Sequence, residues 1–279
     1  MAGYIGNKAV NLSTSGADIS GTANLDVIDV DGAANFAVDV TFADGADIIT
    51  ASAGTSNFRA GVNAGNSIAS GGNYNVVVGD EAGTALTTGD QNTILGYSAG
   101  VALTTGLRNT LLGSTAGDAL VGAERNTAVG YGALHTETEG DRSTAVGVFA
   151  LSTQNTTGGG NIYNTAVGYA AGNAVTTGIK NTLLGSRSGD ALTDADSNVA
   201  IGESALSSDT LGSKSIAIGD SALYAQNFTS ATNTYNIAIG YEAGNAVTTG
   251  TNNTLIGGLA GDAITTGGSN VALGTSALS

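Results

Sequence analysis

The sequence predicts an all-β fold, a parallel β-solenoid or β-roll made of coils of about 17 residues. Three observations predict it. A short phrase, Asn–β-branched–aliphatic–aliphatic–Gly, recurs along the chain. The steps between its copies are too short for repeats made of two helices. The 279 residues include 44 glycines and no proline or cysteine, so neither a bulky single core nor a disulfide framework is expected.

The repeating unit opens with Asn or Ser. Its clear copies begin at Asn75, Asn92, Asn109, Asn126, Ser143, Asn164, Asn181, Asn198, Ser215, Asn236, Asn253 and Asn270. A weaker copy begins at Asn57, which brings the expected number of coils to about 13. Most steps are 17 residues, but two are 21, so four units and one insertion form a super-repeat of 72 residues.

Two short strands are expected in each coil. In the unit that begins at Asn164, Thr165–Val167 predicts the first strand and Asn173–Thr177 the second, because both are short runs with β-branched residues. Gly168 and Gly178 are expected at the corners, where glycine adopts positive φ at low cost. At a strand spacing of ~4.8 Å, 13 coils would extend for roughly 60 Å.

Both faces of the first strand are apolar. The second residue after the opening Asn is apolar in every clear unit, and the third is always aliphatic. Successive side chains of a strand point to opposite faces, and a strand that is apolar on both faces is normally buried on both. One face can fill the coil, whereas the other needs a partner. The pattern therefore predicts a homotrimeric fibre of parallel chains, and a single solenoid with an apolar outer stripe is the alternative.

The opening asparagines predict a structural ladder. Amide side chains stacked at one corner can hydrogen-bond along the axis of the solenoid. A polar row that binds a ligand is the alternative. The predicted ladder residues are Asn92, Asn109, Asn126, Asn164, Asn181, Asn198, Asn236, Asn253 and Asn270.

The chain is expected to have two domains, residues 1–56 and 57–279. The first is acidic, and its segment from Leu25 to Thr50 alternates apolar and polar residues around Asp-Gly turn signals, which predicts an irregular β region. Its aspartates do not converge in a calcium-loop motif, so a solvated acidic surface is expected. The second domain contains the repeats.

Catalysis and cofactor chemistry are not expected. His135 is the only histidine and cysteine is absent, so a His/Cys metal site is excluded by count. Asp118, Asp190 and Asp262 recur four coils apart, ~19 Å along the axis, too far to act as a pair. The triple glycine Gly158–Gly160 lacks the strand and helix of a phosphate loop. The formal net charge of −15 argues against a nucleic-acid partner, and the sequence contains no membrane span.

The phrases "NTAVGY" and "NVAIG" resemble the left-handed parallel β-roll repeats of YadA-type trimeric adhesin heads. The 17-residue form with "TTG" between copies resembles repeats of tail-fibre and virion structural proteins of marine bacteriophages. This resemblance implies a homotrimeric structural fibre or spike, extracellular on the virion, that contributes to attachment to the host surface. It also implies that the N-terminal region attaches the fibre to other virion proteins.

Two alternatives accompany this interpretation. A bacterial trimeric adhesin head on the cell surface would need a secretory signal and an outer-membrane anchor, and this sequence has neither, which favours the phage. A tailspike that binds or cleaves polysaccharide is the second alternative. The last unit begins at Asn270 and stops at Ser279, so the chain is expected to be a matured fragment or part of a longer product.

The two insertions are the predicted contact regions for a host glycan or protein, because insertions in a solenoid form loops that often bind. They lie within residues 151–163 and 223–235. Bracing of neighbouring chains is the alternative role. The candidate receptor contacts are Tyr224, Gln226, Asn227, Phe228, Tyr235, Gln154, Asn155 and Tyr163.

Two other rows have open interpretations. Tyr97, Tyr131, Tyr169 and Tyr241 follow corner glycines and are expected either in an outer row or at a seam between chains. Paired threonines raise ice binding as an alternative, but Val121, Asn155 and Leu211 interrupt the array.

Overall fold

The computed structural model describes residues 53–156 and 158–279, and every regular element among them is a β-strand. All described residues belong to one compact unit, which spans residues 48–279. The irregular β region predicted for the N-terminal domain therefore lies outside the described residues. In the described part, no helix is long and apolar enough to cross a membrane.

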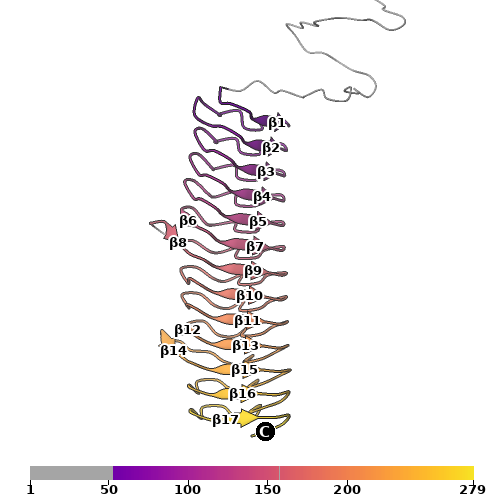
Figure 1. The fold of residues 1–279 in the computed structure, drawn as a ribbon, viewed down its shortest axis with the longest axis vertical. Helices are drawn as coiled ribbons and strands as arrows, with labels where there is room; N and C mark the ends of the chain where they lie inside the picture. The colour runs from indigo at the N-terminus through magenta and orange to yellow at the C-terminus, as the bar shows by residue number, and fades with distance from the viewer. Residues whose placement is uncertain (1–52, 157) are drawn as a thin grey trace, which may run out of the picture. The chain divides into compact units, whose positions relative to one another are not determined.

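Thirteen strands, one from each coil, stack into a single parallel sheet (Figure 1). They are β1 (Phe58–Ala60), β2 (Val76–Val78), β3 (Thr93–Leu95), β4 (Thr110–Leu112), β5 (Thr127–Val129), β7 (Thr144–Val146), β9 (Thr165–Val167), β10 (Thr182–Leu184), β11 (Val199–Ile201), β13 (Ile216–Ile218), β15 (Ile237–Ile239), β16 (Thr254–Ile256) and β17 (Val271–Leu273). Equivalent residues face each other, as Leu183 and Ala166 do in β10 and β9. The all-β parallel solenoid of about 13 coils is confirmed, including the coil that begins at Asn57.

Two short parallel sheets mark the insertions. One pairs β6 (Gly140–Asp141) with β8 (Gly160–Asn161), and the other pairs β12 (Gly212–Ser213) with β14 (Thr232–Asn233). Figure 1 shows both on the side of the coils away from the 13-stranded sheet. The insertions therefore project from the coils without interrupting the main sheet.

The second strand predicted in each coil is wrong. Residues 173–177 form a turn, because Val175 N donates to Gly172 O within the same coil at 3.0 Å. Thr176 N instead donates to Thr193 O of the next coil at 3.0 Å. Because local bonds alternate with bonds between coils, no continuous strand forms. The β-branched residues here hold the turn between neighbouring coils.

The two glycines predicted at the corners do different work. Gly168 has φ of 139°, and a Cβ there would lie 2.6 Å from the carbonyl carbon of Gly185 in the next coil. Positive φ and the close approach of backbone both require glycine at this corner. Gly178 is buried, and a Cβ there would collide with the carbonyl oxygen of Ala195. Glycine is therefore required at Gly178 because the coils stack closely there.

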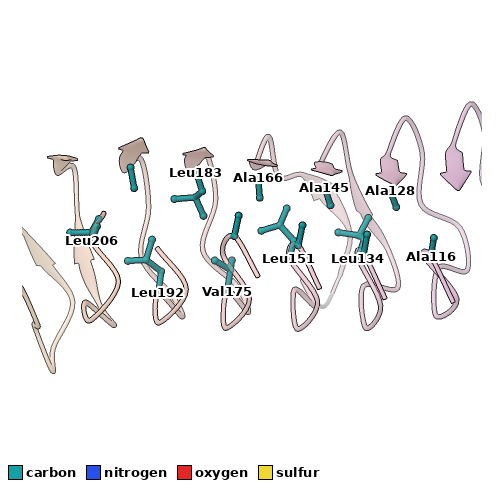
Figure 2. Packing of buried hydrophobic residues seen from close by; sticks show 14 of the residues in the cluster. Ala116, Ala128, Leu134, Ala145, Leu151, Ala166, Val175, Leu183, Leu192 and Leu206 are labelled. Atoms are coloured by element: carbon teal, nitrogen blue, oxygen red, sulfur yellow. The ribbon is translucent and has the colours of Figure 1, made fainter. Parts of the chain in front are cut away.

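The core is a single column of small and medium side chains inside the coils. From β2 to β17, the second residue of each strand of the 13-stranded sheet, such as Ala166 or Leu183, is buried, whereas the first and third face outward. Figure 2 shows these strand residues pointing toward side chains from the opposite wall, such as Val175 and Leu192. Only one face of each strand is therefore covered within the chain.

The interior is filled in two different ways. In one kind of coil, the residue eight positions after the opening Asn is Gly and the residue eleven positions after that Asn is aliphatic, and in most of these coils the second strand residue is larger than Ala. The coil of Asn181 has Leu183, Gly189 and Leu192 at these places. We call these glycine coils. They begin at Asn57, Asn75, Asn92, Asn109, Asn164, Asn181, Asn236 and Asn253.

The second kind, the leucine coils, reverses the sizes. Its strand residue is always Ala, the position eight after the opening is a fully buried Leu, and the position eleven after it is acidic or an amide. The coil of Asn198 has Ala200, Leu206 and Asp209 at these places. Leucine coils begin at Asn126, Ser143, Asn198 and Ser215. The coil of Asn270 has Ala and Leu at the same places, but its Leu278 is 53% exposed. A leucine thus enters from the other wall, so the filled volume is kept, as close packing requires.

Two glycine coils with a small strand residue are filled by their neighbours. In the coil of Asn164 the strand residue is Ala166, and a Cβ on Gly172 would lie 2.6 Å from Leu183 and 2.9 Å from Leu151. Those two leucines belong to the coils on either side. Gly244 has the same surroundings from Leu255 and Leu223. The order of coil types along the chain is therefore part of the packing.

Candidate functional site: the outer sheet face and the insertions

The outward face of the 13-stranded sheet is an aliphatic row. The third strand residue of every coil from Asn75 to Asn270 is Val, Leu or Ile, and none is buried. Exposure is 46% at Leu95, 38% at Val167 and 36% at Ile239, and it is 76% at Leu273 in the last coil. The outward first residues are Thr, Val or Ile. Contiguous apolar surface of this kind marks an interaction site on a soluble protein.

Four tyrosines border this face, each directly after a corner glycine. Tyr97, Tyr131, Tyr169 and Tyr241 are all more than half exposed. Tyr131 meets Phe149 of the next coil edge to face, with ring centroids 5.2 Å apart. A hydrogen bond with Glu242 and the charge of that carboxylate raise the pKa of Tyr241 above its ordinary value. The tyrosines form a sparse row on the surface of the single chain.

The ladder asparagines are buried and link successive coils. The backbone N–H of Asn181 donates to Oδ1 of Asn164 at 2.9 Å. Nδ2 of Asn181 donates to the carbonyl oxygen of Ala195 at 2.8 Å. The same two bonds recur at Asn92, where the partners are Asn75 and Gly106. Because the amides satisfy buried backbone groups, their role is structural.

The ladder continues through the two coils that open with serine. The N–H of Ser143 donates to Asn126 Oδ1 at 2.8 Å, as an asparagine would. Serine has no side-chain amide, and Gln154 supplies one in its place. Its Nε2 donates to Ser143 Oγ at 3.0 Å, and its Oε1 accepts from Asn164 Nδ2 at 2.9 Å. Gln226 does the same between Ser215 and Asn236. Each of these glutamines lies eleven residues after the serine that opens its leucine coil.

The other two leucine coils place a carboxylate at that position. Glu137 and Asp209 are both 0% exposed, and neither forms a salt bridge with a described residue. The amide of Gln154 donates to Glu137 Oε2 at 2.9 Å, and that of Gln226 donates to Asp209 Oδ2 at 2.5 Å. Sequence reasoning missed both carboxylates, although an acidic residue at a position that elsewhere is aliphatic was the signal.

The candidate receptor contacts divide into buried and exposed residues. Gln154 and Gln226 are fully buried and Phe228 is 7% exposed, so the prediction that they face a receptor is wrong. The physical reason is that they anchor the insertions to the interior. Tyr163, Tyr224 and Tyr235 are about half exposed, at 50%, 44% and 51%. Asn227 is exposed and Asn155 is partly buried.

A row of basic and aromatic residues runs directly before the ladder. Five of the chain's eight basic residues lie in it: Arg108, Arg125, Arg142, Lys180 and Lys214. Each has positive φ, between 58° and 66°. Acidic neighbours interleave with them, and Arg125 pairs with Glu124 at 2.6 Å. The row is therefore mixed in charge and is not a basic patch.

The three recurring aspartates sit in partly buried positions. Burial raises the pKa of Asp118 and of Asp190 above the ordinary value, and for Asp118 the nearby His135 partly opposes the shift. Nδ1 of His135 lies 2.6 Å from Asp118 Oδ1, whereas Oδ1 of Asp190 and of Asp262 has no hydrogen-bond partner among the described residues. Four coils separate each aspartate from the next, so no two of them can act as a pair.

The described residues hold no group of three or more His, Asp or Glu side chains that could bind a metal ion. Comparison of the chain with family models, with known proteins and with solved structures found no significant match. The sheet face and the insertions are therefore interpreted from their own geometry.

Proposed function

We propose that this chain is a structural fibre or spike protein of a bacteriophage virion. Three parallel copies would pack the outer faces of their 13-stranded sheets around a shared axis. The observation that supports the assembly is the aliphatic row that one chain leaves uncovered from the coil of Asn75 to that of Asn270. The repeat phrases that resemble virion fibres support the biological setting. The assembled fibre contributes to host attachment, and the N-terminal region joins it to other virion proteins.

The experiment is a measurement of assembly. Sedimentation of the whole chain at micromolar concentration should give three chains per particle. Leu184→Lys places a charge on the aliphatic row and should reduce assembly, because a buried unpaired charge is strongly unfavourable. Thr105→Lys adds the same charge at an exposed site away from the sheet and is the matched control. A wild-type chain that sediments alone would contradict the proposal.

Two alternatives share the repeat architecture. A bacterial trimeric adhesin head would assemble in the same way, and the neighbouring genes separate it from a virion protein. A tailspike would bind or cleave polysaccharide. Incubation with a polysaccharide from the host envelope, followed by measurement of new reducing ends, tests cleavage.

A further inference from the structure

The two insertions share similar residues where they join the coil and differ in between. We call the residues at the junction the base: Gln154, Thr156 and Ile162 with the carboxylate of Glu137 in the first insertion, and Gln226, Phe228 and Thr234 with that of Asp209 in the second. Each begins with Gln-Asn, at Gln154 and Gln226, and each carries Asn two residues before a Tyr that precedes the ladder. Between them, the first insertion has Gly158–Gly160 and the second has Ser230–Thr232. The chain thus presents two unlike sequences at one structural position, 72 residues apart.

The base of the first insertion is held by a buried carboxylate of the preceding coil. Glu137 Oε1 accepts from the backbone N–H of Thr138 at 3.0 Å and of Gly140 at 2.8 Å. Glu137 Oε2 accepts from Gln154 Nε2 at 2.9 Å and from Thr156 Oγ1 at 3.0 Å. Donors from the insertion and from its own turn surround the carboxylate, so the insertion is fixed to the coil at its first residues.

The second base makes the same connection with different residues. Asp209 Oδ1 accepts from the N–H of Gly212 at 3.1 Å and from that of Phe228 at 3.0 Å. Gln226 Nε2 donates to the other oxygen, Asp209 Oδ2, as Gln154 Nε2 donates to Glu137 Oε2 in the first base. Thr234 is fully buried and its hydroxyl lies 2.5 Å from that of Ser215.

The differences between the bases compensate one another. The first pairs Glu137 with a hydroxyl at Thr156 and an apolar Ile162. The second has the shorter Asp209, an apolar Phe228 and a hydroxyl at Thr234. The acid, the apolar residue and the hydroxyl are all kept while their positions change. A base that is preserved through such exchanges acts as one unit that holds the insertion in place.

Each base presents a similar exposed surface. Asn161 of β8 and Asn233 of β14 are exposed, and so are Tyr163 and Tyr235. A cation of the preceding coil lies over each ring: Arg142 Cζ is 5.8 Å from the centroid of Tyr163, and Lys214 Nζ is 5.3 Å from that of Tyr235. These contacts help to orient the two rings, and Lys214 Nζ also donates to the Tyr235 hydroxyl at 3.4 Å.

We propose that each insertion is a preorganised contact patch for an uncharged oligosaccharide of the host surface, with the amide and the tyrosine as its contacts. This inference rests on the attachment role in the proposed function. Tyrosine combines an apolar ring with a polar end, which suits the C–H groups and hydroxyls of a sugar. A protein partner normally needs about 800 Å² on each side, more than a short insertion offers.

The arrangement also suits a repeating polymer. The two patches are four coils apart, ~19 Å along the axis, and three copies in a fibre would present six. Several weak sites on a rigid support bind a polymer more tightly than one site does. Fixing the insertions in advance lowers the entropy lost on binding.

The test is binding of the assembled protein to an array of defined uncharged and acidic oligosaccharides. Wild type should bind uncharged members. Tyr163→Ala with Tyr235→Ala should weaken that binding by about tenfold, since each ring contributes a modest aromatic contact. Tyr74→Ala removes a similarly exposed ring at the same place before the ladder, in a coil that has no insertion, and should leave it unchanged.

Three outcomes would overturn the proposal: no oligosaccharide bound, preference for acidic members, or a loss in Tyr74→Ala as large as that in the double variant. None of them bears on the fibre itself, because assembly is measured separately by sedimentation. Loss of three-chain assembly in wild type would instead overturn the proposed function.

A second test addresses the buried base. Glu137→Asp alone should loosen the first insertion and speed amide hydrogen exchange in residues 158–162. Adding Thr156→Phe and Ile162→Thr reproduces the second base and should restore protection and oligosaccharide binding. Restoration in the triple variant supports a preorganised unit. Unchanged exchange in Glu137→Asp, or no recovery in the triple variant, would count against it.

Discussion

Glycine coils and leucine coils solve the same packing problem from opposite walls. In a glycine coil the interior is filled by the strand residue and by an aliphatic residue of the turn, as Leu183 and Leu192 do. In a leucine coil such as that of Asn198, Leu206 fills the interior, the strand residue is the smaller Ala200, and the residue eleven positions after the opening is the polar Asp209. The comparison shows that the repeat conserves volume across the coil while the residue at each position changes.

The comparison also shows where polar groups can enter a solenoid. In a leucine coil the eleventh position is relieved of filling the core, so a carboxylate or amide can occupy it. Each insertion belongs to a leucine coil and begins eleven residues after its opening serine, at Gln154 or Gln226. The change in packing therefore makes room for the polar base that each insertion needs.

The largest loss of stability is expected when the inward leucine of a leucine coil is placed in a glycine coil. Gly172→Leu should destabilise the fold by roughly 3–5 kcal/mol, because the new side chain meets Leu183 and Leu151 and leucine at φ of 59° costs about 1–2 kcal/mol more than glycine. The measurement is the free energy of unfolding in urea.

The control for that change completes the conversion. Leu183→Ala and Val175→Gln, added to Gly172→Leu, give the coil the pattern of a leucine coil and open space beside it. Partial recovery of stability is expected. If the triple variant is no more stable than Gly172→Leu, compensation of volume between the walls is not the rule.

Truncation of either inward leucine is the next largest effect. Leu192→Ala in a glycine coil and Leu206→Ala in a leucine coil should each cost about 2–5 kcal/mol, since both side chains are fully buried and each would leave a cavity. Similar losses in thermal unfolding would show that the two leucines do equivalent work. A loss below about 1 kcal/mol at either site would show that its coil collapses around the gap.

A substitution in the asparagine ladder should lower the free energy of unfolding by a smaller amount, which depends on the type of coil. Asn181→Ser should cost about 1–3 kcal/mol, because the hydroxyl cannot replace the bond to the carbonyl oxygen of Ala195 and the coil has no glutamine at the eleventh position. Ser215 is stable at the same place because Gln226 supports it. Asn181→Ser with Leu192→Gln supplies such a glutamine, and unfolding in urea should show whether it offsets the serine.

The repeat period predicted the parallel sheet, the number of coils and the Asn ladder geometry directly, because each depends on residues that recur at one spacing. The second strand was predicted wrongly at Asn173–Thr177, since β-branched residues there hold a turn between coils. Gln154, Gln226 and Phe228 were placed on the surface because an insertion usually is exposed. Their burial depends on Glu137 and Asp209, whose meaning appears only when adjacent coils are stacked.

The smallest expected effect is electrostatic and belongs to the glycine coil of Asn181. Burial raises the pKa of Asp190, so the folded state binds its proton more readily than the unfolded state. Its contribution to stability is therefore fully present below the ordinary pKa of aspartate and is lost as pH rises through the folded value. Asp190→Asn should stabilise the protein at neutral pH by less than about 1 kcal/mol, because the carboxylate is partly exposed and screened.

Asp190→Asn should also flatten the dependence of stability on pH above the ordinary aspartate range. Asp194→Asn changes an exposed carboxylate of the same coil and is the matched control. Asp118→Asn should stabilise less than Asp190→Asn, because His135 partly offsets the burial of Asp118. Thermal unfolding from pH 4 to pH 7 separates the three variants. A stability loss in Asp190→Asn at pH 7 would mean that the ionised carboxylate is favourable where it lies.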